Sequence, residues 1–199
     1  MHKKILLLIL SASITTFATT RTEAAWAREQ GASRFPIRLS FVSSFVDIAD
    51  WHDDNTFADV DLIVPVGLSF APYYEFPFGL AIWGGVGPIM VMLGDIDYYN
   101  VPLSLGVGYS FIPNGSVSPY ARLGLHVPIA SGDYVATSSP GPIAAVGVEF
   151  MRKRAIGMQA EIGYIGSSVT FDSSKGDYGN FYNRESIDGG IALSFGVVF

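Results

Sequence analysis

Cysteine, charged residues and long apolar runs are scarce or missing in this chain of 199 residues. The complete lack of cysteine excludes disulfide scaffolds, thiol nucleophiles and cysteine metal sites. Charged residues make up 15% of the chain, against about 25% in an ordinary soluble domain. Hydrophobic residues reach 49%, yet no apolar run has the roughly 18 residues of a membrane-spanning helix. These values argue against disorder, a coiled coil and a bundle of membrane helices.

The net charge of −6 makes the surface a poor match for a polyanion. We therefore expect no nucleic-acid partner.

The first 27 residues have the pattern of a secretory signal peptide. Lys3 and Lys4 precede the apolar run 5–10, and small residues lead to Ala25-Trp26-Ala27. This order of a basic, an apolar and a small-residue region predicts export, with cleavage after Ala24 or Ala27. The alternative, an uncleaved anchor helix, requires a longer apolar core. The remaining residues, 28–199, show no linker and are expected to form one domain.

From Phe35 onward, apolar residues recur at every second position, which is the period of a β-strand. The clearest example is 99–111, where the odd positions are bulky and the even positions are small or polar. The same alternation predicts eight strands, at about 35–46, 58–71, 78–93, 98–111, 117–130, 141–150, 156–166 and 186–199. Short and long connectors alternate between them, as in an up-and-down antiparallel barrel with one turn end and one loop end.

The two faces of these strands differ in composition. One face is bulky and carries no charge in any of the eight segments. Its members include Ile37, Leu39, Phe41, Leu68, Phe70, Ile82, Met90, Leu105, Leu123, Val146, Ile162, Leu193 and Phe195. The other face is mostly Gly, Ser, Ala and Pro and carries all seven strand charges: Arg38, Asp59, Asp61, Arg122, Glu149, Glu161 and Asp188.

A soluble barrel would place the bulky face in its core and long polar side chains outside. Here the second face consists of small side chains rather than long polar ones, so it suits a narrow interior. The bulky face then requires an apolar solvent. Only a closed sheet leaves no backbone edge in lipid. The sequence therefore predicts an all-β, eight-stranded transmembrane barrel. Aromatic residues near the predicted strand ends fit an interfacial girdle: Phe70, Phe78, Tyr99, Tyr109, Phe111, Phe150, Tyr164 and Phe199.

The architecture and the alternating final segment, which ends in Phe199, resemble the small outer-membrane barrels of Gram-negative bacteria. The OmpA-type transmembrane domain and the OmpX group are the most similar. The resemblance implies an outer-membrane surface protein with periplasmic termini, in contact with lipids and lipopolysaccharide. It also implies that the lumen is plugged, or at most a small pore, and that Phe199 is read by the outer-membrane assembly machinery.

Inside an eight-stranded barrel there is room for side chains but not for a wide channel. Alternation places six polar residues in the turn half of the lumen: Arg38, Tyr120, Arg122, Glu149, Gln159 and Glu161. A hairpin with its loop at 131–140 would place Arg122 opposite Glu149, and the next turn would place Gln159 opposite Glu149. Because unpaired buried charges cost several kcal/mol, we expect Arg122 to pair with Glu149, Glu161 or both, and Arg38 to supply a second positive charge.

The loops 47–57, 131–140 and 167–185 are candidates for contact with a host or surface ligand. His52, within an acidic stretch of the first loop, could bind a divalent cation, but its spacing matches no metal loop and a solvated tip is the preferred interpretation. We expect no metal, no cofactor and no enzymatic activity. Two alternatives remain: a barrel enzyme that modifies lipid A, and a periplasmic lipocalin-like binder.

Overall fold

The computed structural model describes residues 31–45, 47–48, 62–63, 66–93, 98–172 and 184–199. Eight strands form its wall: β2 (Pro36–Val42), β4 (Val66–Phe70), β6 (Leu80–Leu93), β8 (Leu103–Ser110), β9 (Val117–Val127), β12 (Gly141–Phe150), β13 (Gly157–Asp172) and β14 (Arg184–Val198). Each pairs antiparallel with its neighbours, β14 pairs with β2, and β6 pairs with both β4 and β8, so the ring is closed. The predicted eight-stranded antiparallel barrel is confirmed.

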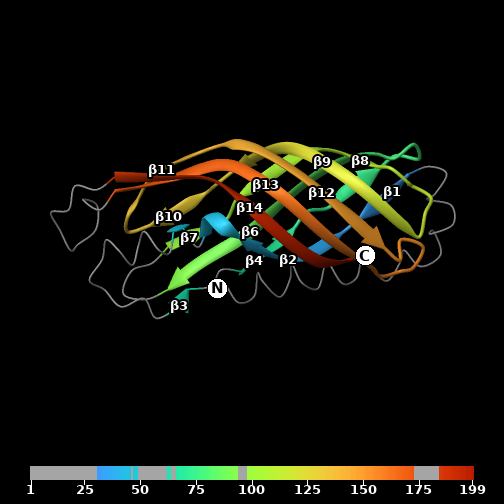
Figure 1. The fold of residues 1–199 in the computed structure, drawn as a ribbon, viewed down its shortest axis with the longest axis horizontal. Coiled ribbons are helices and arrows are strands. Elements are labelled where there is room, and N and C mark those ends of the chain that lie inside the picture. Colours follow the sequence, from blue (N-terminus) through green and yellow to red (C-terminus); the bar gives the residue numbers. More distant parts are fainter. Residues whose placement is uncertain (1–30, 46, 49–61, 64–65, 94–97, 173–183) are drawn as a thin grey trace, which may run out of the picture.

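Six shorter strands extend this ring: β1 (Ala32–Arg34), β3 (Leu62–Ile63), β5 (Tyr73–Glu75), β7 (Tyr98–Asn100), β10 (Ala130–Gly132) and β11 (Val135–Ser139). Strand β1 pairs with β5 near the turns, whereas β7 pairs with β10 and β11 pairs with β13 near the loops. In Figure 1 the loop end lies at the left and the turn end, with the C-terminus, lies at the right. No helix in the described part of the chain is long and apolar enough to cross a membrane.

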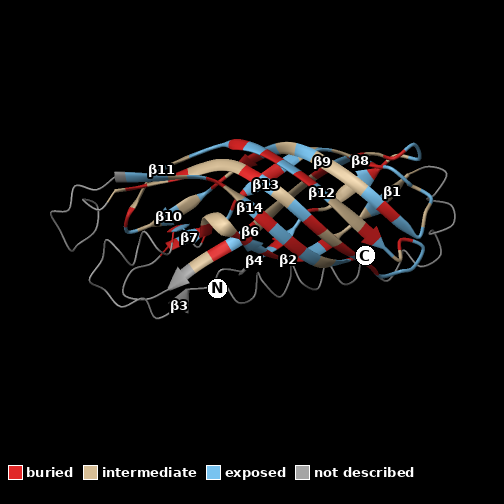
Figure 2. Ribbon diagram, viewed as in Figure 1, coloured by how far each residue is buried: buried red, intermediate tan, exposed pale blue. Residues whose placement is uncertain are grey.

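Buried and exposed residues alternate along the wall strands, as the colours in Figure 2 show. Leu39, Leu105, Leu123 and Phe195 are 59%, 63%, 62% and 67% exposed. Their neighbours in sequence on the other face are buried or half-buried. The bulky face therefore points out of the barrel, as predicted. A lipocalin-like binder would require the opposite orientation, with the bulky face inside.

The C-terminal residue lies on the seam that closes the ring. The backbone N–H of Phe35 donates to the carbonyl of Phe199 at 3.1 Å, and the N–H of Phe199 donates to Phe35 at 3.4 Å. These two bonds continue the β14–β2 ladder to the end of the chain.

A bulge in β6 contradicts the predicted orientation of Met90. Between Leu68 and Phe70, two residues of β4 advance while three residues of β6 pass, and Gly87 has a φ of +104°. Glycine adopts this backbone conformation without a steric penalty, and the extra residue reverses the alternation. Met90 consequently lies inside, 6% exposed, and Ile89 lies outside at 37%.

A second irregularity corrects the orientation of Asp188. The β13–β14 register shifts between Ile165 and Ser168, opposite Gly189 of β14, which has a φ of +75°. Beyond this point Ile187 packs against the interior, and Asp188 is exposed and accepts a hydrogen bond from Ser186 at 2.9 Å. Asp188 is therefore not a lumen residue. Asp59 and Asp61, also predicted to point inward, lie outside the described residues.

The strand predicted at 35–46 ends at Val42, and residues 43–45 and 47–48 are helical. Ser43 caps the neighbouring edge, because its hydroxyl accepts the backbone N–H of Ile191 at 2.8 Å. The helical segment brings Phe45 and Ile48 into the barrel, where they are 0% and 3% exposed.

The interior has two halves of different polarity. The loop half is filled by an apolar cluster that the composition of the small-residue face did not predict. Its members are Val42, Phe45, Ile48, Ala71, Trp83, Met90, Tyr98, Tyr134, Ile143, Ile165, Val169, Phe171 and Ala192. The turn half carries the buried charges, which form the candidate functional site.

Candidate functional site in the barrel lumen

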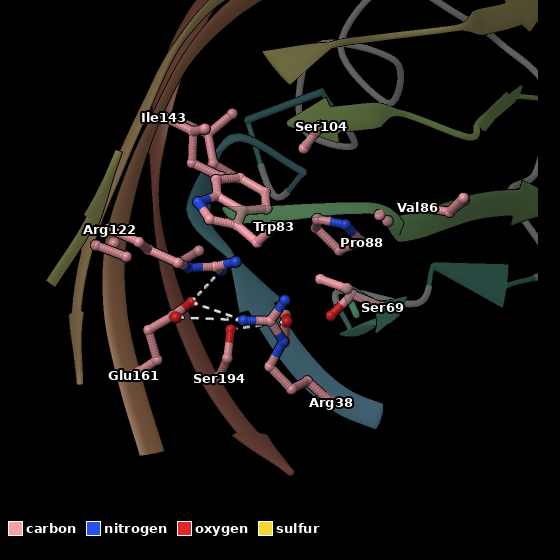
Figure 3. A pocket seen from close by; sticks show the side chains of 18 residues that line it. Arg38, Ser69, Trp83, Val86, Pro88, Ser104, Arg122, Ile143, Glu161 and Ser194 are labelled. Carbon is pink, nitrogen blue, oxygen red and sulfur yellow. Dashed lines mark hydrogen bonds and ion pairs between the residues drawn. The ribbon is translucent and has the colours of Figure 1, made fainter. Parts of the chain in front are cut away.

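Glu161 of β13 is the centre of a buried polar group that spans the lumen. Arg122 of β9 donates from Nη2 to Glu161 Oε1 at 2.5 Å, and Arg38 of β2 donates from Nη1 to Oε2 at 3.2 Å. The hydroxyl of Tyr120 donates to Glu161 Oε2 at 2.9 Å. We call these four residues the lumen clasp. It ties three separate strands together across the barrel, and Figure 3 shows both guanidinium groups converging on the carboxylate.

Trp83 of β6 packs against the lumen clasp from a fourth strand. The guanidinium carbon of Arg122 lies 4.6 Å from the centre of the Trp83 ring, within the range of a cation–π interaction. The indole N–H donates to the carbonyl of Val107 at 3.2 Å, which holds the ring in place. The cation is therefore held by the carboxylate of Glu161 and also lies over the aromatic ring of Trp83.

A second group of charges closes the turn end. Arg152 donates from Nη2 to Glu75 Oε2 at 2.5 Å and lies 3.4 Å from Glu149. Arg34 lies 3.7 Å from Glu149 Oε1 and donates to the carbonyl of Arg152 at 3.1 Å. We call Arg34, Glu75, Glu149 and Arg152 the turn-end cluster. With two cations and two carboxylates, this cluster is balanced in charge.

Arg152 also holds neighbouring turns in place. Its Nη1 donates to the carbonyls of Ile112 and Pro113 at 3.3 and 2.9 Å. Burial by itself lowers the pKa of Arg152, but the hydrogen bond to Glu75 and the charge of Glu149 outweigh burial, so the pKa is raised above its ordinary value. Arg152 therefore remains a cation that connects two turns to the lumen carboxylates.

The structure brings together Arg38, Tyr120, Arg122 and Glu161, all of which the sequence placed in the lumen. It does not bring Arg122 to Glu149. In the β9–β12 ladder, Arg122 lies opposite Ala145, and Glu149 lies opposite Ser118. The predicted register is wrong because the pairing stops at His126–Gly141, after which the chain turns away to form β10 and β11.

Gln159 does lie opposite Glu149, as the pairing across the next turn predicted. It is 5% exposed, and its Nε2 has no hydrogen-bond partner among the described residues. Glu149 instead accepts a hydrogen bond from the hydroxyl of Tyr73 at 2.6 Å.

Sequence reasoning missed Arg34, Tyr73, Glu75 and Arg152. Three of them could have been found, because the inward alternation of β2 continues back to Arg34, and that of β4 continues past Ala71 to Tyr73 and Glu75. The predicted strands begin at 35 and end at 71, so these three positions fall just outside them. Arg152 follows no such pattern, since Met151 has a φ of 55° and the alternation ends in that turn.

The clasp and Trp83 border two small cavities. The loop-side chamber encloses about 30 Å³, and its polar lining beyond the clasp includes Ser40, Ser69, Ser104 and Ser194. The turn-side chamber encloses about 40 Å³, and its polar lining beyond the clasp includes Tyr73, Ser110, Glu149 and Gln159. A buried water requires about 10–15 Å³ of such space, so each chamber has room for a few water-sized molecules and not for a large solute.

His126 lies at the end of the polar interior that is nearer the loops. The Nδ1 atom of this residue, which is 2% exposed, lies 2.8 Å from the hydroxyl oxygen of Ser104 on the facing strand. This pair faces the lumen. His52, the candidate cation ligand of the first loop, lies outside the described residues.

Comparison with known proteins gives a result only at the level of structure. No protein-family model matches the chain, and no curated protein sequence does. The solved outer membrane protein OprG from Pseudomonas aeruginosa aligns over 86% of this chain and 97% of its own, with a TM-score of 0.50 and 11% identity. The chain has the fold of a small outer-membrane β-barrel. Identity this low establishes the fold and nothing about activity.

Two further structures were also found. The outer membrane protein AlkL is 16% identical, with a TM-score of 0.49, over 86% of this chain and 90% of its own. Neisserial surface protein A is 16% identical, with a TM-score of 0.47, over 85% of this chain and 98% of its own.

Proposed function

We propose that this protein is an integral outer-membrane surface protein of a Gram-negative bacterium, with both termini in the periplasm. The observation that carries the proposal is a closed barrel whose outer surface is a belt of large apolar side chains. Such a surface is stable only in lipid, since water would have to solvate every one of these side chains. Outer-membrane lipids and lipopolysaccharide are the partners that this belt fits.

Its role is structural or interactive rather than that of an open channel. The turn half of the lumen is crossed by the clasp and closed by the turn-end cluster, and the loop half is filled by apolar side chains. Two cavities of about 30 and 40 Å³ leave at most a small pore. Contact with a host or surface ligand would then fall to the loops 47–57, 131–140 and 167–185.

Two finer points belong to the same proposal. Likeness to the OmpA-type domain and the OmpX group is supported by the eight-stranded architecture. A role for Phe199 as a signal to the outer-membrane assembly machinery is supported by its place on the closing seam, where it completes the ladder with Phe35.

We further propose that the protein acts without catalysis. A barrel enzyme that works on lipid A needs its reactive groups at the lipid face, whereas the contact between His126 and Ser104 faces the lumen. The measurement is mass spectrometry of lipid A from cells with and without the protein. A change in acylation or headgroup mass would contradict this part of the proposal.

The lack of cysteine allows a direct test of location and orientation. Asp133→Cys places one thiol near the loop end, and Lys153→Cys places one in an exposed turn at the opposite end. On intact cells, a thiol reagent that does not cross membranes should label the Asp133 variant, and both variants should react once the outer membrane is permeabilised. Recovery of the protein as a soluble monomer, or surface labelling of the Lys153 variant alone, would overturn the proposal.

A further inference from the structure

The lumen clasp contains more positive than negative charge. It holds two guanidinium groups, those of Arg38 and Arg122, and a single carboxylate, that of Glu161. The turn-end cluster cannot supply the missing negative charge, because its two carboxylates already face Arg34 and Arg152. The described lumen therefore carries one surplus positive charge, and this charge belongs to the clasp.

The surplus charge lies away from bulk water. The side chains of Arg38 and Arg122 are 5% and 12% exposed. A buried charge is costly unless an opposite charge or several hydrogen-bond partners compensate it. Glu161 has no capacity to spare, since Oε1 accepts from both arginines and Oε2 accepts from Arg38 and Tyr120.

The arginines also have hydrogen-bonding capacity left. The Nε atoms of Arg38 and Arg122 are both buried, and neither has a hydrogen-bond partner among the described residues. Both arginines line the loop-side chamber, and Figure 3 shows the Arg38 guanidinium directed at Glu161, with Ser69 to the side of it. The chamber thus combines unsatisfied cationic donors with serine hydroxyl groups, and both kinds of group bind anions.

We propose that the loop-side chamber is a binding site for a small monovalent anion of halide size, chloride being the natural candidate. The chamber is preferred over the turn-side chamber because Glu149 lines the latter and would repel an anion. A volume of about 30 Å³ has room for a halide, which is close to a water molecule in size, and a monovalent anion matches the single surplus charge of the clasp. The inference depends on the barrel geometry and holds whether or not the proposed location is correct.

The first test measures stability against chloride. Purified barrel in a non-ionic detergent is unfolded with urea at constant ionic strength, while gluconate is replaced stepwise by chloride. An anion that binds only the folded state multiplies the folding equilibrium constant by one plus the ratio of its concentration to Kd. We expect this constant to rise with chloride and to approach a tenfold gain for each tenfold increase above Kd. A constant that does not change with chloride would overturn the proposal.

Matched variants separate the chamber from the surface. Arg38→Gln removes the surplus charge and should abolish the chloride dependence, whereas Arg154→Gln removes an exposed arginine and should leave it unchanged. Ser69→Leu fills the chamber, keeps both arginines and should abolish the dependence too, which gives an answer even if Arg38→Gln does not fold. An equal chloride response in the parent and in the chamber variants would mean that the anion acts elsewhere.

Anomalous diffraction from crystals grown in bromide locates the ion directly. We expect a bromide peak between the clasp and Ser69. Density for water alone at that position would overturn the proposal, as would bromide found only on the outer surface.

Discussion

Replacing Glu161 by Gln should destabilise the barrel more than any single change among its arginine partners. The substitution keeps the size of the side chain and removes its charge. Arg38 and Arg122 would then be two buried cations with no carboxylate between them. Breaking a buried ion pair by removal of one partner costs about 3–5 kcal/mol, and here one substitution removes the partner of two cations.

The reverse change should be milder. In Arg122→Met, Glu161 keeps Arg38 at 3.2 Å and Tyr120 at 2.9 Å, so its charge remains compensated. What is lost is one charged hydrogen bond and the cation–π contact with Trp83, about 2–3 kcal/mol together. The surplus positive charge of the clasp is also removed, which offsets part of this loss.

The assay is reversible urea unfolding in detergent, with gluconate as the buffer anion so that no halide can replace the lost carboxylate. A double-mutant cycle on Arg122 and Glu161 should give a coupling free energy above about 1 kcal/mol, whereas the cycle on Arg122 and Glu149 should give less than about 0.5 kcal/mol. The reasoning is refuted if Arg122→Met costs more than Glu161→Gln, or if Arg122 couples to Glu149 rather than to Glu161.

Three further outcomes are expected. Leu105→Arg, on the exposed face of β8, should cost about 2–4 kcal/mol in bilayer refolding, whereas Ile112→Arg in an exposed turn should cost at most about 1 kcal/mol; equal costs would contradict the assigned faces. Arg152→Met should cost about 3–5 kcal/mol in urea unfolding by leaving the buried Glu75 without a cation and weakening the compensation of Glu149, which keeps only Arg34, with the exposed Lys153→Met as a nearly neutral control. Phe199→Ala should slow the appearance of the heat-modifiable band in cells more than it lowers the stability of the finished barrel, and normal assembly rates would contradict a signalling role.

The alternation of bulky and small residues predicted correctly which side chains face outward wherever the strands are regular. Along 103–111 every odd position is exposed, as predicted. The alternation failed at Met90 and Asp188, and both errors lie within three residues of a glycine with positive φ, Gly87 and Gly189. A period of two cannot reveal a bulge, because one extra residue shifts every later side chain to the other face.

The clasp residues were expected in the lumen, with Glu161 as one of two expected partners of Arg122, whereas Arg34, Glu75 and Arg152 of the turn-end cluster were not. That Arg38, Arg122, Glu149 and Glu161 point inward follows from their positions on the strands. Which of them meet depends on the register of each hairpin, and the ladder between β9 and β12 ends earlier than loop length suggested. The cause is pairing beyond the hairpin, where β10 joins β7 and β11 joins β13.

The sequence by itself determined the class of this protein. Its alternation, its uncharged bulky face and its small inner face are compatible with a closed barrel in lipid and with little else. Each strand must present one face that lipid can solvate and another that fits a narrow interior. Only the tertiary structure decided that Glu161 pairs with two arginines and that Arg152, which lies in a turn, forms an ion pair with Glu75. Such contacts join strands far apart in the chain, and their geometry depends on the curvature and register of the whole ring.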